Sequence, residues 1–354
     1  MAHSVRSDHG KRLAIRFLLL LSLVSVSLSA HSQLNVLMYH HVSDTTPPST
    51  STRVSDFQVH LDYLAEHHTI VDLVDALEAI QARQPLPDNA VALTFDDAYI
   101  SVYDTAWAMM AEKEFPFTVF VATQPVDRRS SNTIHWDQLR EMHAAGVRLL
   151  NHTAGHDYMV RAEAYDDAWL SAVMGSVAQA QQRLTQELGE EPPKVFAFPY
   201  GEYNDRLQSA MAEAGYISMG QHSGGIAEFS DWQGLPRFAA GGTGANLDTL
   251  RTKLQSGPLP VQFPLPDQVT NDTRPVLETQ LQDVDDVRWD ALNCFTGAGQ
   301  PIPFSITDGV LITQADTDLS PGRQRYNCTA PARSGGFYYW LSQQWLIGQG
   351  PADY

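Results

Sequence analysis

Two adjacent carboxylates, Asp96 and Asp97, follow directly on the apolar run 91–95. A buried strand that runs straight into two negative charges is unfavourable unless something compensates the charge. A metal ion does so, because one carboxylate can bind it while its neighbour stays free to accept a proton. Paired aspartates are also common on loops and at helix caps, so this pair alone leaves both interpretations open.

Two histidines, His152 and His156, follow a second apolar run at 147–150. Histidines four residues apart can face one metal ion from a single helical turn or a tight loop; the alternative is that both are solvated. Together with Asp97 they make a set of two imidazoles and one carboxylate. These are the ligand types of a catalytic zinc site that keeps one position open for water.

Two further polar segments also end apolar runs. Pro199-Tyr200-Gly201 follows the run 195–198, and a Pro–Gly turn can aim a backbone N–H into a site, as an oxyanion hole requires. His40 and His41 end the strand-like segment Asn35–Tyr39. Successive strand residues point to opposite faces, so at most one of these two histidines can enter a common site.

Short apolar runs alternate with amphipathic segments from residue 35 to about residue 260. The predicted strands are 35–39, 91–95, 117–121, 147–150, 195–198 and 217–219; the predicted helices are 55–66, 72–83, 102–113, 136–145, 166–188 and 204–214. Gly146, Gly189 and Gly215 stand where three of these helices should end. The pattern predicts an α/β fold with a parallel sheet, a deformed or incomplete (β/α) barrel. In such a barrel all four polar segments converge on the face that carries the active site.

The N-terminus is typical of a signal peptide, which we assign to residues 1–32. A basic segment ending at Arg16 precedes an apolar run that continues to Leu28. This arrangement predicts an exported protein, periplasmic or extracellular, with an uncleaved anchor as the alternative.

The composition changes after the predicted catalytic domain, which we assign to residues 33–260. Residues 261–275 are proline-rich and predicted to be a linker, and 276–354 are predicted to form a small all-β, sandwich-like domain. Asp308-Gly309 is a predicted turn within it. Export favours a disulfide between Cys294 and Cys328, with buried free thiols as the alternative.

The net charge is strongly negative, with 41 acidic and 23 basic residues giving −18. Nothing resembles the basic stripe that phosphate binding needs, so we expect no nucleic-acid partner. An acidic surface suits a cationic ligand or product, although it also serves simply to keep an exported protein soluble.

The sequence at these motifs resembles the polysaccharide deacetylases that share the NodB homology domain (carbohydrate esterase family 4). Thr94-Phe95-Asp96-Asp97 is similar to the first motif of that family, the segment 152–156 to the second, and Pro199-Tyr200-Gly201 to the third. The resemblance covers roughly residues 35–260 and includes the order and spacing of the motifs.

The resemblance implies roles for individual residues. Asp96 would be the catalytic base, the Tyr200 N–H an oxyanion donor, and Asp97, His152 and His156 the ligands of one divalent metal ion. That ion would be zinc, with nickel, cobalt or iron as alternatives.

The sequence departs from the usual family pattern in three places, and the last two point to one branch. Ala98 stands where glycine commonly follows the aspartates, no arginine precedes the third motif, and no Leu-x-x-His motif lies near residues 250–259. The branch that deacetylates poly-β-1,6-N-acetylglucosamine has a circularly permuted motif order, and its N-terminal strand carries the general-acid histidine, which His40 matches. That branch also carries a late Pro-Arg pair, similar to Pro236-Arg237. Asp231-Trp232 is a loose match to the fourth motif.

The implied function is metal-dependent removal of N-acetyl groups from an N-acetylglucosamine-containing polysaccharide, with a poly-β-1,6-N-acetylglucosamine-like exopolysaccharide favoured. A deacetylase of another glycan or of O-acetyl esters is one alternative. An alternative of a different class is a non-catalytic glycan-binding protein. Aromatic residues near the C-terminus are candidates for a sugar-stacking face, with an ordinary β-domain core as the alternative: Trp289, Tyr326, Tyr338, Tyr339 and Trp340. Nothing in the sequence indicates an oligomeric state.

Overall fold

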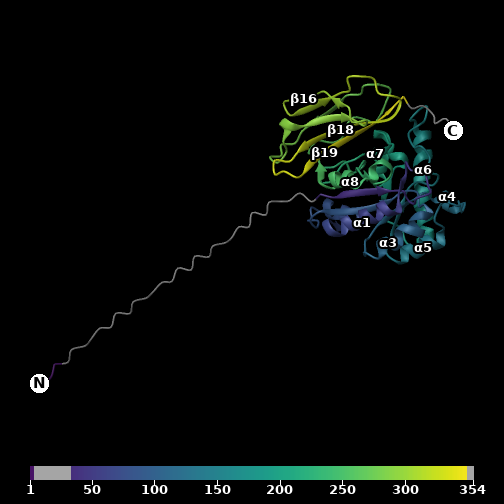
Figure 1. The fold of residues 1–354 in the computed structure, drawn as a ribbon, viewed down its shortest axis with the longest axis horizontal. Coiled ribbons are helices and arrows are strands. Elements are labelled where there is room, and N and C mark those ends of the chain that lie inside the picture. Colours follow the sequence, from purple (N-terminus) through teal and green to yellow (C-terminus); the bar gives the residue numbers. More distant parts are fainter. Residues whose placement is uncertain (4–32, 349–354) are drawn as a thin grey trace. The chain divides into compact units, whose positions relative to one another are not determined.

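The computed structural model describes residues 1–3 and 33–348 of the chain (Figure 1). The chain divides into two units, Met1–Ala30 and His31–Tyr354, and the fold below is that of the second. Apart from residues 1–3, the predicted signal peptide 1–32 lies outside the described residues. Among the described residues, no helix combines the length and apolar character that crossing a membrane requires.

A curled sheet of eight strands forms the centre of the fold, in the order β10-β1-β5-β6-β7-β8-β9 with β4 beside β5. Its strand pairs are parallel. The strands are β1 (Asn35–Tyr39), β4 (Thr69–Ile70), β5 (Ala90–Phe95), β6 (Thr118–Val121), β7 (Arg148–Asn151), β8 (Val195–Ala197), β9 (Ile217–Met219) and β10 (Phe238–Ala239). The sheet order is open rather than closed, so the predicted incomplete (β/α) barrel is confirmed.

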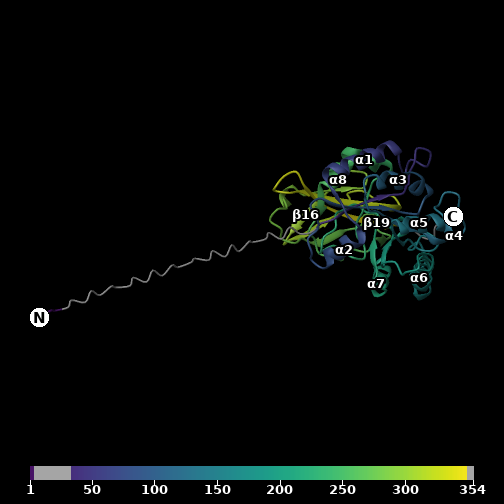
Figure 2. The ribbon, with the colours of Figure 1, turned by 90° about the horizontal axis from the view of Figure 1, so that it is seen from below.

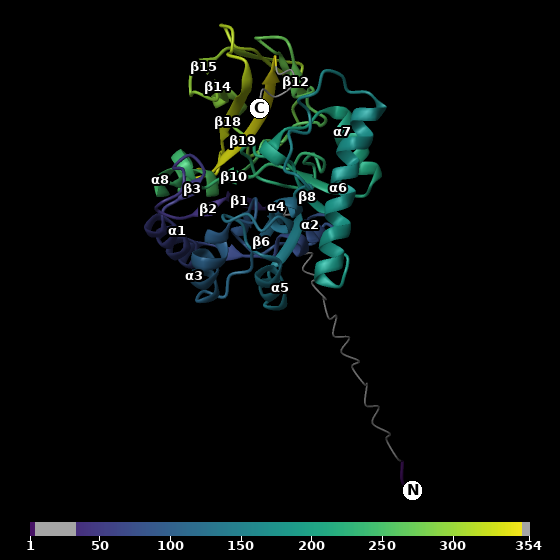
Figure 3. The ribbon, with the colours of Figure 1, turned by 90° about the vertical axis from the view of Figure 1, so that its right-hand side faces the viewer.

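Helices follow the strands as the amphipathic pattern predicted, and Figures 2 and 3 show how they surround the sheet. They are α1 (Val54–His67), α2 (Leu73–Gln81), α3 (Trp107–Ala111), α4 (Thr123–Asp127), α5 (Trp136–Ala144), α6 (Asp167–Leu188), α7 (Asp205–Glu213) and α8 (Leu247–Leu254). The predicted helix 102–113 begins with a π-helical turn, η1 (Val102–Ala106). Gly146, Gly189 and Gly215 have φ of +95°, +78° and +80°, which confirms the predicted helix ends.

Both faces of the sheet are buried, which explains why its strands are apolar throughout. On β5, Val91, Leu93 and Phe95 pack into a core that also contains residues of α1, α3 and α5. The alternate residues Ala90 and Ala92 pack into a second core with α2. This alternation follows from the period of two in strand side chains.

The C-terminal part of the chain forms two further sheets, labelled through β16, β18 and β19 in Figure 1. The first contains β11 (Ser256–Pro258), β12 (Val269–Thr270), β14 (Asn293–Thr296), β15 (Pro301–Ile302), β18 (Gly322–Pro331) and β19 (Tyr338–Ile347). The second contains β13 (Leu277–Gln280), β16 (Phe304–Thr307) and β17 (Val310–Thr313). Asp308 and Gly309, both left-handed with φ of +51° and +77°, connect β16 to β17, as predicted for a hairpin turn.

The disulfide between Cys294 and Cys328 is confirmed. The two residues lie opposite each other on β14 and β18, with their Cα atoms 4.1 Å apart. Both are buried in the core that the two C-terminal sheets share. The bond therefore joins neighbouring strands of one sheet inside a small apolar core.

The proline-rich segment 261–275 is integrated into this region. Its strand β12 pairs in parallel with β19, and Val261 is fully buried. A purely sequence-based linker assignment misses such contacts, because they depend on strands more than 70 residues later in the chain. The domain boundaries themselves remain predictions.

Most of the C-terminal aromatic residues are used in packing. Tyr326 is fully buried, and Trp289 and Tyr339 pack against the same core. Trp340 lies edge-on to Phe238, with ring centroids 5.7 Å apart. Contact of this region with a glycan stays a prediction.

A buried histidine, His222, makes stability depend on pH. Burial, together with the smaller effect of the charges of Arg325 and Arg237, lowers its pKa to about 3. Between pH 3 and the ordinary value of about 6.5, the unfolded chain binds a proton at this site that the native protein does not. The contribution of this group to the free energy of unfolding is therefore fully present above pH 6.5. It is lost as the pH falls below 6.5, by up to about 1.4 kcal/mol per pH unit.

We expect His222→Gln to show a shallower loss of unfolding free energy between pH 7 and pH 4.5 than the wild type. Urea unfolding at several pH values measures this directly. Parallel curves for the two proteins would contradict the expectation.

Candidate active site

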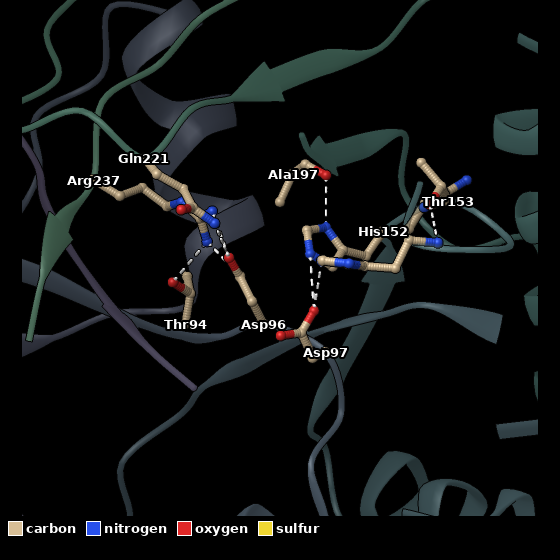
Figure 4. Close-up of polar contacts among 10 residues, drawn as sticks. Thr94, Asp96, Asp97, His152, Thr153, Ala197, Gln221 and Arg237 are labelled. Carbon is tan, nitrogen blue, oxygen red and sulfur yellow. Dashed lines mark hydrogen bonds and ion pairs between the residues drawn. The ribbon is translucent and has the colours of Figure 1, made fainter. Parts of the chain in front are cut away.

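The four polar segments meet at the carboxyl ends of neighbouring strands. His40 follows β1, Asp96 and Asp97 follow β5, and His152 follows β7. Tyr200 lies in the short 3-10 turn η2 (Pro199–Gly201) after β8. Because the strands are parallel, their carboxyl ends share one edge of the sheet. Figure 4 shows the polar contacts of Asp96, Asp97 and His152 at this edge.

Three ligand-type side chains converge in this cluster. The Nε2 atom of His156 lies 2.9 Å from Oδ1 of Asp97, and Nε2 of His152 lies 3.3 Å from the same oxygen. Potential ligand atoms of the three residues all lie within 4.8 Å of one another. The structure thus brings together the set of metal ligands that the sequence predicted.

The hydrogen bonds of His152 leave one ring nitrogen available to a metal ion. Its Nδ1 lies 2.7 Å from the carbonyl oxygen of Ala197, which can only accept, so Nδ1 carries the proton. In the neutral ring, Nε2 then presents a lone pair toward Oδ1 of Asp97. Neither this nitrogen nor that oxygen has a hydrogen-bond partner among the described residues, although both are buried. A cation between them would give both buried atoms a partner, so the residues fit a divalent metal ion.

The same three residues perturb one another electrostatically. Burial raises the pKa of Asp97, but the two imidazoles lower it more strongly, so it lies well below its ordinary value. Burial lowers the pKa of His156, but Asp97 and neighbouring carboxylates outweigh that effect and raise it. Asp97 is therefore an anion throughout the neutral range, as a metal ligand must be.

Asp96 faces a different set of partners from its neighbour. It is fully buried and paired with the fully buried Arg237, with Nη1 and Nη2 of the guanidinium 2.7 and 2.8 Å from its two oxygens. Gln221 donates a longer hydrogen bond of 3.3 Å (Figure 4). Burial raises the pKa of Asp96, but Arg237 outweighs burial and the net pKa is lowered. Asp96 is thus ionised and separate from the three ligand-type residues.

His40 and His41 diverge, as strand geometry predicted. His40 interacts electrostatically with Asp96, Asp97, Arg237 and His152, and burial lowers its pKa although the two carboxylates raise it. His41 instead stacks on Tyr99, with ring centroids 3.6 Å apart and planes inclined by 20°. His40 therefore belongs to the cluster, and His41 packs beside it.

Left-handed backbone conformations gather at this site. Five non-glycine residues there have positive φ: Asp97 (72°), Ala98 (52°), Thr153 (67°), His156 (61°) and Tyr200 (59°). Each such residue costs on the order of 1–3 kcal/mol unless its surroundings hold it. Thr153 shows one such restraint, because its hydroxyl accepts a hydrogen bond of 2.9 Å from the His156 amide. The left-handed φ of Ala98 also gives a physical reason for the glycine common at that position.

Tyr200 lies beside the cluster, and its backbone amide has no backbone acceptor among the described residues. The amides of Gly201 and Glu202 donate to Phe198 and Pro199, whereas that of Tyr200 donates to no backbone carbonyl among the described residues. Its ring lies edge-on to His156, with centroids 4.7 Å apart. The amide is thus free for an external oxygen atom, although no described contact assigns it that role.

Arg237 and Gln221 were not predicted as site residues. Arg237 stands 141 positions from Asp96, and only the Pro-Arg pair of the resembling branch gave a signal for it. Asp231 and Trp232, the loose fourth-motif match, contact other groups. Asp231 accepts a hydrogen bond from Gln208, and Trp232 donates to the carbonyl of Glu228.

The comparison with protein families agrees with this geometry. Residues 83–219, which include β5, β7 and β8, match the family model described as Polysaccharide deacetylase. This central part of the chain is similar to polysaccharide deacetylases. The family resemblance drawn from the three motifs is therefore confirmed.

One curated relative is the poly-beta-1,6-N-acetyl-D-glucosamine N-deacetylase of Escherichia coli (strain K12). It is 26% identical to this chain over 246 residues, which cover 58% of this chain and 36% of the relative. This chain spans less than two thirds of the length of the first curated relatives that it matches, 63% of one and 36% of the other.

Two solved structures share the fold. The Streptococcus pyogenes deacetylase PplD, in complex with acetate, aligns with a TM-score of 0.56 at 20% identity, covering 63% of this chain and 99% of that one. IcaB from Ammonifex degensii aligns with a TM-score of 0.55 at 24% identity, covering 63% and 97%. Both alignments leave out more than a third of this chain.

Proposed function

We propose that this protein is an exported, metal-dependent polysaccharide deacetylase that removes N-acetyl groups from an N-acetylglucosamine-containing polymer. The observation that carries the proposal is the pairing of two sets of residues at one sheet edge: the ligand set Asp97, His152 and His156, and the ionised Asp96 beside it. The name of the Escherichia coli relative favours a poly-β-1,6-N-acetylglucosamine-like substrate. Periplasmic or extracellular location follows from the predicted signal peptide.

The ligand set would hold one divalent ion, with zinc favoured and nickel, cobalt or iron as alternatives. When bound, such an ion supplies Lewis-acid polarisation of the acetyl carbonyl and lowers the pKa of the attacking water. Asp97 contributes a carboxylate, and His152 and His156 contribute neutral ring nitrogens. The Ala197 carbonyl fixes the tautomer and ring orientation of His152 for this task.

Asp96 would take the proton from the attacking water. The ion pair with Arg237 keeps Asp96 ionised despite burial, so an acceptor is present before the reaction begins. The Tyr200 amide would donate to the oxyanion of the tetrahedral intermediate. His40 would protonate the departing glucosamine nitrogen, which otherwise would leave as a strongly basic anion.

The pKa of His40 adds a constraint on this last step. Burial lowers it, so His40 is uncharged at neutral pH before the reaction. It therefore needs a proton by the time the nitrogen departs, and Asp96 gains one in the first step. The electrostatic coupling of His40 to Asp96 favours that transfer.

An acetate-release assay tests the proposal. We expect release from N-acetylglucosamine polymers, loss of release with a chelator, and recovery when a divalent ion is restored. A panel of acetylated glycans and O-acetyl esters separates the favoured substrate from its alternatives. Binding of glycan without acetate release from any of them would show a non-catalytic glycan-binding protein instead.

We expect His40→Ala to keep the metal but lower acetate release from an amide substrate by about 10²-fold or more, because the leaving nitrogen needs a proton. The rate of hydrolysis of an activated ester, whose leaving group is a stable anion, should fall much less in this variant. His41→Ala is the comparison variant. Its ring stacks on Tyr99, and of the two aspartates it is coupled to Asp97 but not to Asp96, so we expect it to be mild on both substrates.

Equal damage to amide and ester hydrolysis in His40→Ala would refute its role as general acid. A more severe effect of His41→Ala would move that role one residue along the chain.

A further inference from the structure

Two neighbouring carbonyl groups of the third-motif turn are held by the C-terminal sheet. Nη1 of Arg323, on β18, donates to the carbonyl oxygen of Tyr200 at 2.9 Å. Nε2 of Gln344, on β19, donates to the carbonyl oxygen of Gly201 at 2.8 Å. Gln344 is 2% exposed, so this second contact is closed to solvent. The turn that carries the proposed oxyanion donor therefore rests on residues more than 120 positions away.

The long strands of the C-terminal sheet are two-faced. Tyr326 and Trp345 point into the core that the C-terminal sheets share. The other face of β19 turns toward the catalytic sheet, where Leu346 joins a core with residues of α6 and α7 and Trp340 packs on Phe238. Arg323 and Gln344 belong to this second face by the alternation of strand side chains. The residues of this second face therefore make the contacts that pack the sheet on the catalytic domain.

A cluster of charges and rings links Arg323 to the second motif as well. Nε of Arg323 lies 3.5 Å from Oε1 of Glu202, a fully buried carboxylate. Arg161 donates to both oxygens of Glu202, at 2.9 and 2.6 Å. The Arg161 guanidinium lies 3.9 Å from the ring centroid of Tyr158, and that ring stacks on Tyr200 at 3.9 Å. Tyr158 and Arg161 belong to the segment that follows His156.

The backbone of the turn depends on such restraints. Tyr200 and Gly201 are consecutive left-handed residues, with φ of +59° and +69°. A Cβ added to Gly201 would lie 2.6 Å from the amide nitrogen of Gln221, so the turn also packs tightly on the residue that donates to Asp96. Because the amide and carbonyl of Tyr200 flank one Cα, fixing the carbonyl limits the directions that the amide can take.

We propose that the C-terminal sheet is a structural part of the active site, with Arg323 and Gln344 as positioning residues that aim the Tyr200 amide. This inference rests on the proposed function for its catalytic consequence, because it assigns a task to the amide within that reaction. The C-terminal domain would then serve catalysis through the turn, independently of any contact with glycan.

The test compares Arg323→Ala and Gln344→Ala with the wild type in the full-length protein. We expect hydrogen–deuterium exchange of the Gly201 and Glu202 amides, which donate to Phe198 and Pro199 within the turn, to accelerate by roughly tenfold or more. On an N-acetylglucosamine oligomer we expect kcat to fall by about 10- to 100-fold with KM little changed. Metal content should stay at the wild-type level, because the ligands lie on other turns. Arg323→Lys should restore only part of kcat, since an ammonium cannot contact carbonyl and carboxylate as a guanidinium does.

Arg274→Ala is the matched control. Arg274 is an arginine of the same region, half exposed, whose ion pair with Asp318 at 3.6 Å lies wholly within the C-terminal sequence. We expect it to match the wild type in exchange and in kcat.

Unchanged exchange at Gly201 and Glu202 in both test variants would overturn the inference, and so would a rise in KM with unchanged kcat, which indicates substrate contact. If exchange is faster in the variants but the wild type releases no acetate, the positioning role of Arg323 and Gln344 would be supported and the proposed function rejected. The two failures are therefore distinguishable.

Discussion

His152→Ala is expected to remove the metal ion and to reduce acetate release to the level of chelator-treated wild type. The reason is that His152 is one of the three proposed ligands and that its ring is held in a fixed orientation. Its Nδ1 donates to Ala197 at 2.7 Å, and the ring is fully buried. Loss of this ligand leaves one imidazole and one carboxylate, too few for a stable catalytic site. His156→Ala should have the same result.

Metal content by elemental analysis and acetate release measure the two effects separately. His143→Ala is the matched control, because His143 lies on α5 and pairs with Glu190 at 3.3 Å, outside the cluster. We expect it to bind one ion per chain and to keep its activity. Full metal content in both His152→Ala and His156→Ala would reject the assignment of the ligands.

The sequence predicted the fold well because the catalytic sheet is parallel and covered on both faces. Such strands are apolar runs bounded by polar residues, and the helices between them end at glycines with positive φ. The predicted strand 35–39 coincides with β1, and the predicted helices 136–145 and 166–188 match α5 and α6 within one residue at each end. The C-terminal region was harder, because β14 and β18 pair over long separations and carry mixed patterns.

The proximity of the three proposed ligands was predictable for the same reason. Asp97, His152 and His156 lie in the short segments after two apolar strands, so strand position and residue type together indicate a shared edge. Arg237 could not be found this way. It precedes β10 and is fully buried, and a buried arginine has no local pattern that separates it from a surface arginine. The Ala197 carbonyl that orients His152 is a backbone atom and leaves no trace in residue type.

Arg323 and Gln344 illustrate a second limit. Their side chains donate to the backbone carbonyl oxygens of Tyr200 and Gly201, so the residue types at positions 200 and 201 do not indicate the contact. The contact depends on how the C-terminal sheet packs on the rest of the fold. The alternation of side chains in β18 and β19 predicts that the sheet has two different faces, but not what each face contacts. The partner of each face becomes visible only when the chain is folded.

Asp96→Asn is expected to keep the metal ion and to lower the rate of acetate release by about 10²–10⁴-fold, the range that general-base catalysis contributes. The two aspartates are adjacent in sequence but face different partners. Asp97 lies against His152 and His156, whereas Asp96 is paired with Arg237. An amide in place of the Asp96 carboxylate cannot accept the proton, yet it leaves the ligand set untouched. Asp97→Asn should lose both metal and activity.

The buried ion pair complicates Asp96→Asn, and a second variant separates the effects. Asparagine leaves the fully buried Arg237 without a counter-charge, which costs on the order of 3–5 kcal/mol of stability. The double variant Asp96→Asn, Arg237→Gln removes that unpaired charge, so its unfolding free energy should recover while its activity should not. Recovery of activity together with stability would mean that Asp96 acts only through the fold. Metal loss in Asp96→Asn with metal retention in Asp97→Asn would exchange the roles of the two aspartates.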